Sequence, residues 1–247
     1  MTATVVVTAS AGAFPGLVEA LRAIPVAVED APLMTFAPPL DWQPVDAAVR
    51  NLGRYEAVAF TSPRSAAAFA DRLRTLKVRP VLGIGVWAAG AGTAKALGDS
   101  LSGIQQPSER AVADRGAAAA LADALVDADL RGPLLFPCGD LRRDELPARL
   151  RSRGVEVDEV VCYRSVLAGE MEARRAAERA QVLVVASPSV AGLLARACPS
   201  GVRPALVAVG PTTAAAARAS GWPPAGVASR PTAEALAAAV RALVASH

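Results

Sequence analysis

Residues 134–150 read LLFPCGDLRRDELPARL and bring several chemically useful side chains into one short stretch. An apolar run leads into Cys138 and Gly139, and Arg142 and Arg143 follow closely. Three interpretations are open at this point: a catalytic thiol at Cys138, a phosphate cradle at Gly139, or an anion site formed by the two arginines beside an ordinary strand-to-helix turn. The rest of the chain must decide between them.

The chain lacks the bases on which nucleophilic catalysis and many metal sites depend. Its single histidine is the last residue, His247, which excludes Ser-His-Asp triads, Cys-His dyads and histidine-dependent metal sites within one chain. Cys138, Cys162 and Cys198 fit neither a CxxC motif nor any zinc spacing. We therefore expect structural thiols and no metal site, with Cys138 in a turn and Gly139 supplying backbone freedom there.

A glycine-rich stretch at residues 85–98, GVWAAGAGTAKALG, raises the question of a nucleotide site. A P-loop places Gly-Lys-Ser/Thr on the phosphates, whereas Lys95 lies two residues beyond Thr93. A Rossmann fingerprint needs a third glycine, which is missing after Gly90 and Gly92. The stretch instead predicts a helix start whose free N–H groups favour a carboxylate or a phosphate.

Two kinds of turn occur twice in the chain. Ser-Pro follows an apolar run in FTSPRSAAAF (60–69) and in VASPSVAGLL (185–194), which predicts a helix with serine as N-cap and proline at its first position. Further along, AAGAGTAKAL (88–97) matches AVGPTTAAAA (208–217) and places Thr93 and Thr213 at equivalent positions. These threonines either cap their helices or present hydroxyls to an acidic ligand.

Arginines and one tyrosine complete the candidate residues. Arg64 follows the first Ser-Pro, and Arg142 and Arg143 are expected in the first turn of the helix that follows FPCGD. The helix dipole does not favour a cation there, so a ligand anion would account for them; a solvated surface is the alternative. Tyr163, one of two tyrosines, either faces a ligand or packs in a hinge.

Composition restricts the class of protein. Of the 247 residues, 53% are apolar, and the formal charge is +3 with a pI of about 9.0. No basic stripe with interleaved aromatic residues occurs, which argues against nucleic acid and suits a small acidic ligand. Neither a signal peptide nor an uninterrupted run of eighteen apolar residues is present, so we expect a cytoplasmic protein that does not bind membranes.

Short valine-rich runs alternate with alanine- and leucine-rich stretches, which predicts a parallel α/β sheet covered on both faces. The expected strands are residues 4–8, 57–61, 133–137, 182–187 and 205–210. Each run ends in a small or turn-forming residue, so ligands should bind at the loops that follow the strands. Helices are expected over 114–125 and 230–240, among others.

The strand–helix–strand unit that opens the chain also repeats, in permuted order. Shifted by 129 positions, Val5 and Leu17 fall on Leu134 and Leu146, and other apolar positions match in the same way. We expect two similar domains, with a hinge that the chain crosses twice. Residues 1–36 and 167–247 form domain 1, residues 40–162 form domain 2, and residues 36–40 and 162–167 form the hinge.

At this point the sequence resembles the uroporphyrinogen-III synthase family. The resemblance rests on FTSPRSAAAF, AAGAGTAKAL, residues 134–166, SPSVAGL, VAVGPTTAAAARASG and SRPTAEALAAAVRAL, which follow the family order across nearly the whole chain. It implies an α/β fold of two similar flavodoxin-like parallel-sheet domains joined by a two-stranded hinge with an interdomain cleft.

The resemblance also implies an enzyme that uses no cofactor. Such an enzyme takes hydroxymethylbilane, removes its terminal hydroxyl, inverts the last pyrrole ring through a spirocyclic intermediate and closes the macrocycle with loss of water. The catalytic positions would be Tyr163, Thr93 and Thr213. Substrate binding would fall to Ser62, Pro63, Arg64, Gly90, Gly139, Arg142, Arg143, Ser187, Ser189, Gly210 and Thr212. A monomer is implied, and functional coupling to the upstream hydroxymethylbilane synthase is possible.

One departure affects the first loop. Many family members end their first strand in a basic residue, where this chain has Ala9 and Ser10, so a substrate contact there is in doubt. Two other functions stay open at this stage. One is a two-domain binding protein for an acidic small molecule, and the other is a nucleotide-dependent enzyme that uses the glycine-rich turn.

Overall fold

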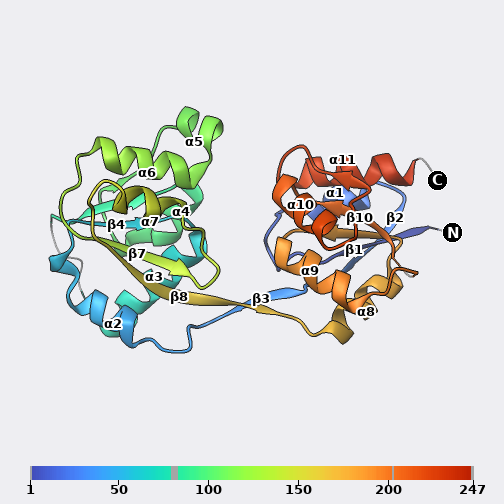
Figure 1. Ribbon diagram of the computed structural model, residues 1–247, viewed down its shortest axis with the longest axis horizontal. Coiled ribbons are helices and arrows are strands. Elements are labelled where there is room, and N and C mark those ends of the chain that lie inside the picture. Colours follow the sequence, from blue (N-terminus) through green and yellow to red (C-terminus); the bar gives the residue numbers. More distant parts are fainter. Residues whose placement is uncertain (1, 79–82, 202, 246–247) are drawn as a thin grey trace. The chain divides into compact units, whose positions relative to one another are not determined.

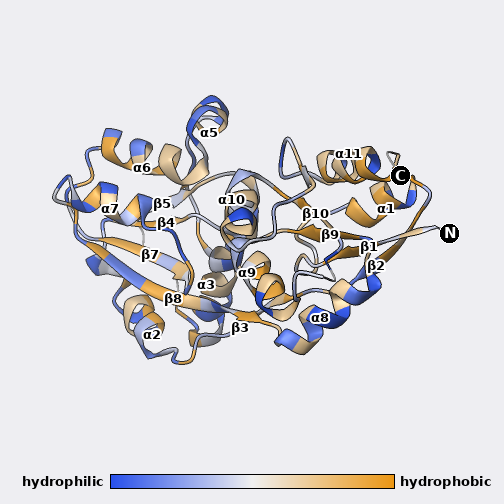
Figure 2. Cartoon of the chain, turned by 45° about the vertical axis from the view of Figure 1, so that its right-hand side comes forward, coloured by the Kyte–Doolittle hydropathy of each residue, from blue (hydrophilic) through white to orange (hydrophobic). Residues whose placement is uncertain are grey.

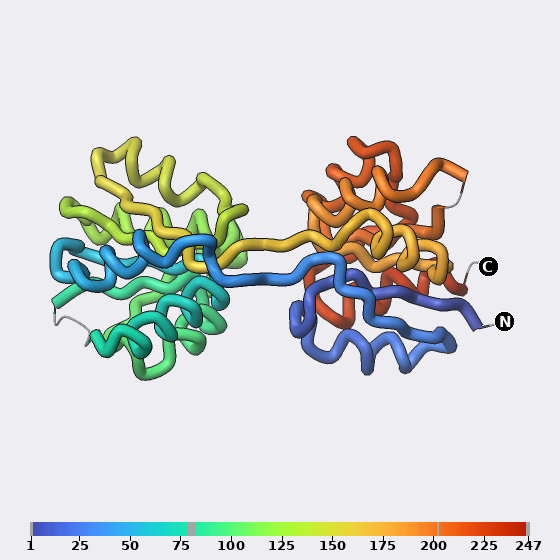
Figure 3. The backbone as a smooth tube through the Cα atoms, turned by 90° about the horizontal axis from the view of Figure 1, so that it is seen from below, coloured from blue at the N-terminus to red at the C-terminus, as the bar shows by residue number. Residues whose placement is uncertain are grey.

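The computed structural model describes residues 2–78, 83–201 and 203–245, and the chain divides into two compact units. Unit 1 comprises residues 1–35 and 166–247, and unit 2 comprises residues 36–165. Figures 1 and 3 show that the chain passes between the units twice. It passes first through β3 (Met34–Ala37) and then through β8 (Val157–Leu167), and these two strands are hydrogen-bonded to each other.

Unit 1 is built on a five-stranded parallel sheet of order β11-β10-β9-β1-β2. Numbered by occurrence within the unit, this order is 2-1-3-4-5, the flavodoxin-like arrangement. Its strands are β1 (Ala3–Val7), β2 (Val26–Asp30), β9 (Val182–Val185), β10 (Ala205–Ala208) and β11 (Gly226–Val227). Its helices are α1 (Leu17–Arg22), α8 (Glu170–Arg179), α9 (Pro188–Ala197), α10 (Pro211–Ala219) and α11 (Ala233–Val244).

Unit 2 has the same spatial arrangement in permuted chain order: its strands lie as β6-β5-β4-β7-β8, so that β7 and β8 take the places of β1 and β2, and β3 is added beside β8. Its remaining strands are β4 (Ala57–Phe60), β5 (Gly85–Ala88), β6 (Ile104–Gln105) and β7 (Leu134–Gly139). The helices are α2 (Gln43–Arg50), α3 (Pro63–Leu76), α4 (Ala91–Leu97), α5 (Glu109–Arg115), α6 (Ala117–Asp127) and α7 (Glu145–Arg151), with short 3-10 helices η1 (Leu52–Arg54) and η2 (Gly98–Ser100). The predicted repeat is therefore present in both sheets.

Each sheet buries side chains on both faces, as valine-rich parallel strands require. In unit 1, Val6 and Leu183 pack toward α8, α9 and α10, whereas Val5 and Val184 pack toward α1 and α11. Figure 2 shows β1, β9 and β10 as hydrophobic ribbons. In unit 2, Phe60 packs toward α2 and α3, and the alternate strand positions pack toward α6 and α7. Because the side chains within the strands are buried in this way, only those at the strand ends and in the loops after them can contact a ligand.

The helix starts follow the sequence signals closely. The Ser62 and Ser187 side chains accept hydrogen bonds from the N–H groups of Ser65 at 3.1 Å and Val190 at 3.2 Å, so both are N-caps as predicted. The helix expected over 114–125 is instead two helices, because Gly116 adopts φ 85° and ends α5 where α6 begins. None of the helices in the described ranges is both long and apolar enough to cross a bilayer.

We expect Ser187→Ala to lower the free energy of unfolding by about 1 kcal/mol, because an N–H at the start of α9 loses its acceptor. Ser62→Ala should do the same at α3. Ser189→Ala is the matched control, since Ser189 lies on α9 but caps nothing. Urea denaturation of the three variants checks this, and an equal loss for Ser187→Ala and Ser189→Ala would contradict the capping role.

Candidate functional site

The strongest candidate site lies at the carboxyl ends of the parallel strands of unit 2, where α/β sheets bind ligands. A cavity of about 410 Å³ opens there between the loops that follow β4 and β7 and the start of α6. Five of the residues predicted from the sequence line it: Ser62, Gly139, Arg142, Arg143 and Tyr163. The fold thus brings together residues that are far apart in the chain.

Tyr163 lies on β8 and borders two hollows. Besides the cavity it lines a groove of about 420 Å³ together with Phe36, Arg64 and Trp42. The Tyr163 and Phe36 rings meet edge to face, with centroids 5.7 Å apart. The Tyr163 hydroxyl has no hydrogen-bond partner among the described residues. It is therefore available to a bound molecule.

Arg64 lies in the first turn of α3, as predicted, and stacks on an aromatic ring. Its guanidinium carbon is 3.3 Å from the centroid of Phe36 and 5.7 Å from that of Tyr163. Burial against these rings lowers the pKa of Arg64, although an arginine stays charged at neutral pH. No carboxylate pairs with it in the part of the chain that the structure describes. A cation held by aromatic rings alone can accept an anionic ligand.

The expected turn at Cys138 and Gly139 is wrong, because both residues belong to β7. Cys138 is buried, and burial raises the pKa of its thiol to about 12, so it is a core residue and not a nucleophile. Gly139 is needed for a close approach and not for backbone freedom. A β-carbon at this position would come within 2.7 Å of Tyr163 Cε2.

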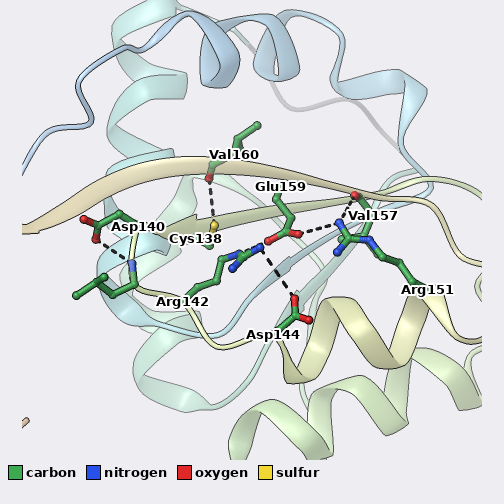
Figure 4. Close-up of polar contacts among 9 residues, drawn as sticks. Cys138, Asp140, Arg142, Asp144, Arg151, Val157, Glu159 and Val160 are labelled. Carbon is green, nitrogen blue, oxygen red and sulfur yellow. Dashed lines mark hydrogen bonds and ion pairs between the residues drawn. The ribbon is translucent and has the colours of Figure 1, made fainter. Parts of the chain in front are cut away.

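Arg142 and Arg143 do not lie in the first helical turn, because α7 begins only at Glu145. Both belong to the loop after β7. Arg142 donates to the Glu159 carboxylate of β8, and Arg151 of α7 donates to the other oxygen of that carboxylate at 2.7 Å (Figure 4). Chiefly through the Arg142 hydrogen bond, the pKa of Glu159 is lowered and that of Arg142 raised.

Arg143 differs from its neighbour. It is exposed, lines the same cavity, and has no carboxylate partner among the described residues. Arg142 is committed to Glu159 and lies 4.0 Å from Asp144, so its charge is largely balanced. Of the two arginines, Arg143 is the one whose charge is free for a ligand.

Thr93 and Thr213 are not N-caps. The caps of α4 and α10 are Gly90 and Gly210, whose backbones are nearly identical, with φ/ψ of 176°/173° and 179°/179°. Both threonines are buried two positions inside their helices, and neither hydroxyl has a hydrogen-bond partner within the described residues. A β-carbon at Gly90 or Gly210 would meet nothing within 4 Å, so the space beside each cap is open.

The remaining predicted residues are distributed over both units. In unit 2, α4 begins close to α3, since a β-carbon at Gly92 would lie 3.8 Å from Pro63 Cγ. In unit 1, Ser187, Pro188 and Ser189 open α9, and Gly210, Thr212 and Thr213 open the neighbouring α10. A cavity of about 210 Å³ at the first loop is lined by Ala9, Ser10 and Asp30, and its lining includes no lysine or arginine.

One part of the cavity, the start of α6, was not predicted from the sequence. Ala117 and Ala118, at the start of α6, line it together with the arginines. Gly116 precedes them without a side-chain cap, so the first N–H groups of an 11-residue helix lack internal partners. The only signal in the sequence was a glycine inside an apparently continuous helix.

The chemistry of the site is therefore anion binding and hydrogen bonding. Arg64, Arg143 and the start of α6 supply positive charge or N–H donors, and Tyr163 supplies an unpartnered hydroxyl. The described residues include no group of three or more His, Cys, Asp or Glu side chains arranged to hold a metal ion.

Comparison with known proteins identifies the family and the fold. The family model for uroporphyrinogen-III synthase HemD matches residues 15–238. Two solved structures each match over 100% of both chains. One is a mutant uroporphyrinogen III synthase from the extremely thermophilic bacterium Thermus thermophilus, with 15% identity and a TM-score of 0.66. The other is the uroporphyrinogen-III synthetase from Helicobacter pylori, with 19% identity and a TM-score of 0.62. No curated protein sequence matches.

We expect Glu159→Gln to lower the free energy of unfolding at pH 7 by about 1–3 kcal/mol, because two arginines lose a charged acceptor. The Glu159 side chain is only 15% exposed. Its folded pKa lies below the ordinary 4.5, so the stabilisation is complete above that value and is lost as the pH falls through the folded pKa.

The difference between parent and Glu159→Gln should therefore shrink on acidification below about pH 4, which urea denaturation at several pH values measures. Glu156→Gln is the matched control, because Glu156 is 66% exposed and lies 3.7 Å from its partner Arg54. A difference between parent and Glu159→Gln that stays constant with pH would show that the carboxylate charge is not what stabilises the loop.

Proposed function

Because the chain belongs to the uroporphyrinogen-III synthase family of heme-biosynthesis enzymes, we propose that it cyclises hydroxymethylbilane with inversion of the terminal pyrrole ring. The terminal hydroxyl leaves as water, the ring inverts through a spirocyclic intermediate, and the macrocycle closes as uroporphyrinogen III. The pyrrole nitrogen supplies the electron pair that expels the hydroxyl, so the reaction needs no enzymatic nucleophile. The work left to the chain is to bind and orient.

The observation that carries this proposal is the cavity of unit 2. It places an unpaired arginine, Arg143, and the start of α6 on the same hollow as the Tyr163 hydroxyl. The linear tetrapyrrole carries acidic side chains on every ring, and arginines and helix N-termini are good carboxylate partners. Arg64, stacked on Phe36, offers a second cation beside Tyr163.

We propose that Tyr163 assists the departure of the substrate hydroxyl. Its unpartnered phenol can donate a hydrogen bond to the leaving oxygen, while the substrate nitrogen provides the driving force. Thr93 and Thr213 keep unpartnered hydroxyls beside open glycine caps, and we assign both to substrate hydrogen bonds. We also assign Ser62, Pro63 and Gly90 of unit 2 and Ser187, Ser189, Gly210 and Thr212 of unit 1 to substrate binding, which would favour a near-attack conformation.

The proposal also names a partner enzyme, an oligomeric state and a cellular location. The substrate cyclises unaided to the wrong isomer, so rapid transfer from the upstream hydroxymethylbilane synthase would be useful, and we propose functional coupling to it. We also propose that the chain acts as a monomer in the cytoplasm. Co-purification with the upstream enzyme and light scattering of the pure protein test these two points.

The activity is tested by generating hydroxymethylbilane with its synthase, adding this protein, oxidising the products and separating the uroporphyrin isomers by chromatography. Mostly isomer III is expected. Only isomer I, formed at the rate seen without the protein, from a folded sample would reject the proposal and favour a binding protein that uses the same cavity.

We expect Tyr163→Phe to lower kcat by about 10–100-fold, because the leaving hydroxyl loses its hydrogen-bond donor. The free energy of unfolding should change little, since that hydroxyl has no partner in the described protein. Tyr55→Phe is the matched control. The Tyr55 hydroxyl bonds to Asp158, so its loss should lower stability and leave kcat unchanged. Equal kcat values for Tyr163→Phe and the parent would remove Tyr163 from the mechanism.

We expect Arg143→Met to raise KM by about 5–20-fold, the equivalent of one charged hydrogen bond, and to leave the melting temperature unchanged. Arg142→Met should lower the melting temperature and leave KM unchanged, because its loss leaves Glu159 with only one arginine. Steady-state kinetics and thermal melts of both variants separate the two roles. A larger KM effect for Arg142→Met would show that its ion pair opens when substrate binds.

A further inference from the structure

Tyr163 lies where the pairing of β7 with β8 loses its register. From Leu134 to Cys138 the two strands pair residue for residue, with Cys138 opposite Val161. The next pair joins Gly139 to Tyr163, so Cys162 is an extra residue on β8. An extra residue of this kind bends a strand and re-aims the side chain that follows, and such irregularities are common beside active sites.

Asp140 holds the strand beyond this irregularity. Its N–H donates to the Tyr163 carbonyl oxygen at 3.1 Å. Its carboxylate oxygen Oδ1 accepts from the Ser165 N–H at 2.8 Å and from the Leu141 N–H at 2.9 Å. One residue thus holds the backbone of β8 at the Tyr163 carbonyl and at the Ser165 N–H, just beyond the point where the regular pairing with β7 ends.

The position of the Tyr163 ring depends on that backbone. The ring passes close over Gly139 and meets the edge of Phe36, but its hydroxyl is not anchored to any described residue. A phenol whose oxygen has no partner keeps its direction only through packing and through its main chain. Asp140 ties this main chain to the loop after β7.

We propose that Asp140 is a positioning residue for Tyr163, acting through the main chain of β8. The inference rests on the proposed function in one respect only: that Tyr163 donates a hydrogen bond to the departing hydroxyl of the substrate. The carboxylate serves as a hydrogen-bond acceptor for Ser165 and not as a charge, so an amide oxygen in the same place should replace most of its effect. Without the acceptor, β8 loses its tie to the loop after β7 at Ser165, although it stays paired with β3, and the direction of the ring is less well fixed.

The experiment combines kinetics with a spectroscopic label. The chain has two tyrosines, so 3-fluorotyrosine gives two ¹⁹F resonances, and Tyr163→Phe identifies the one from Tyr163. Asp140→Ala should shift or broaden the Tyr163 resonance, leave that of Tyr55 in place, and lower kcat about 10-fold with KM changed less than about 2-fold. Asp140→Asn should recover most of the loss.

Two controls make the result specific. Asp140→Ala combined with Tyr163→Phe should be no slower than Tyr163→Phe alone, because Asp140 acts only through that hydroxyl. Asp41→Ala removes another carboxylate that accepts a backbone N–H, that of Gln43 at 2.8 Å, and should change neither readout. If Asp140→Ala melts below the assay temperature, Gly139→Ala replaces it, because its β-carbon would push on the Tyr163 ring directly.

An unchanged Tyr163 resonance in Asp140→Ala overturns the inference whatever the activity. Equal damage from Asp140→Asn and Asp140→Ala, or additive losses in the double variant, also overturns it. A moved resonance with unchanged kcat supports the positioning by Asp140 and rejects the assignment of Tyr163 to the leaving hydroxyl, so failure of the inference and failure of the proposed function are distinguishable.

Discussion

Six residues of β7 pair with β8, and the site of unit 2 depends on where that pairing changes register. Five regular pairs bury Leu134, Phe136 and Cys138 on one face and Leu135 on the other, which fixes both strands in the core. The sixth pair comes one residue late on β8 and brings Tyr163 against Gly139. The buried pairs fix both strands up to this point, and the register change beyond them decides where the Tyr163 ring lies.

The arginines around this point fall into two groups, those paired with a carboxylate and those without one. Glu159 binds Arg142 and Arg151 and thereby ties the loop after β7 and helix α7 to β8. Arg143 and Arg64 remain without carboxylate partners among the described residues, one on the cavity and one stacked on Phe36. The paired arginines hold the loop and helix in place, and the unpaired ones keep a positive charge that could bind an acidic molecule. A substrate that is already activated needs this positioning more than a perturbed acid or base.

Much of the fold could be read from the sequence, because the signals are local. Valine-rich runs, Ser-Pro caps and the repeat of apolar positions all depend on residues close in the chain, and the structure confirms the caps at Ser62 and Ser187. One error was local, the division of the expected helix at Gly116, and others concern tertiary contacts. Gly139 is small because Tyr163, from another strand, passes over it, and Arg142 is bound by Glu159 from β8. The roles of the candidate residues stay predictions.

The internal repeat allows equivalent positions of the two units to be compared, and they differ in the residues of one loop. Gly90 and Gly210 have almost the same backbone angles, so both copies keep the open cap and the buried threonine. The loops after β1 and β7 are also equivalent, but β7 is followed by Arg142 and Arg143, whereas the loop after β1 has Ala9 and Ser10 beside Asp30. The shared glycine–threonine turn supplies hydroxyls in both units. If the protein acts as proposed, carboxylate binding at these equivalent loops depends on unit 2, because only its loop carries arginines.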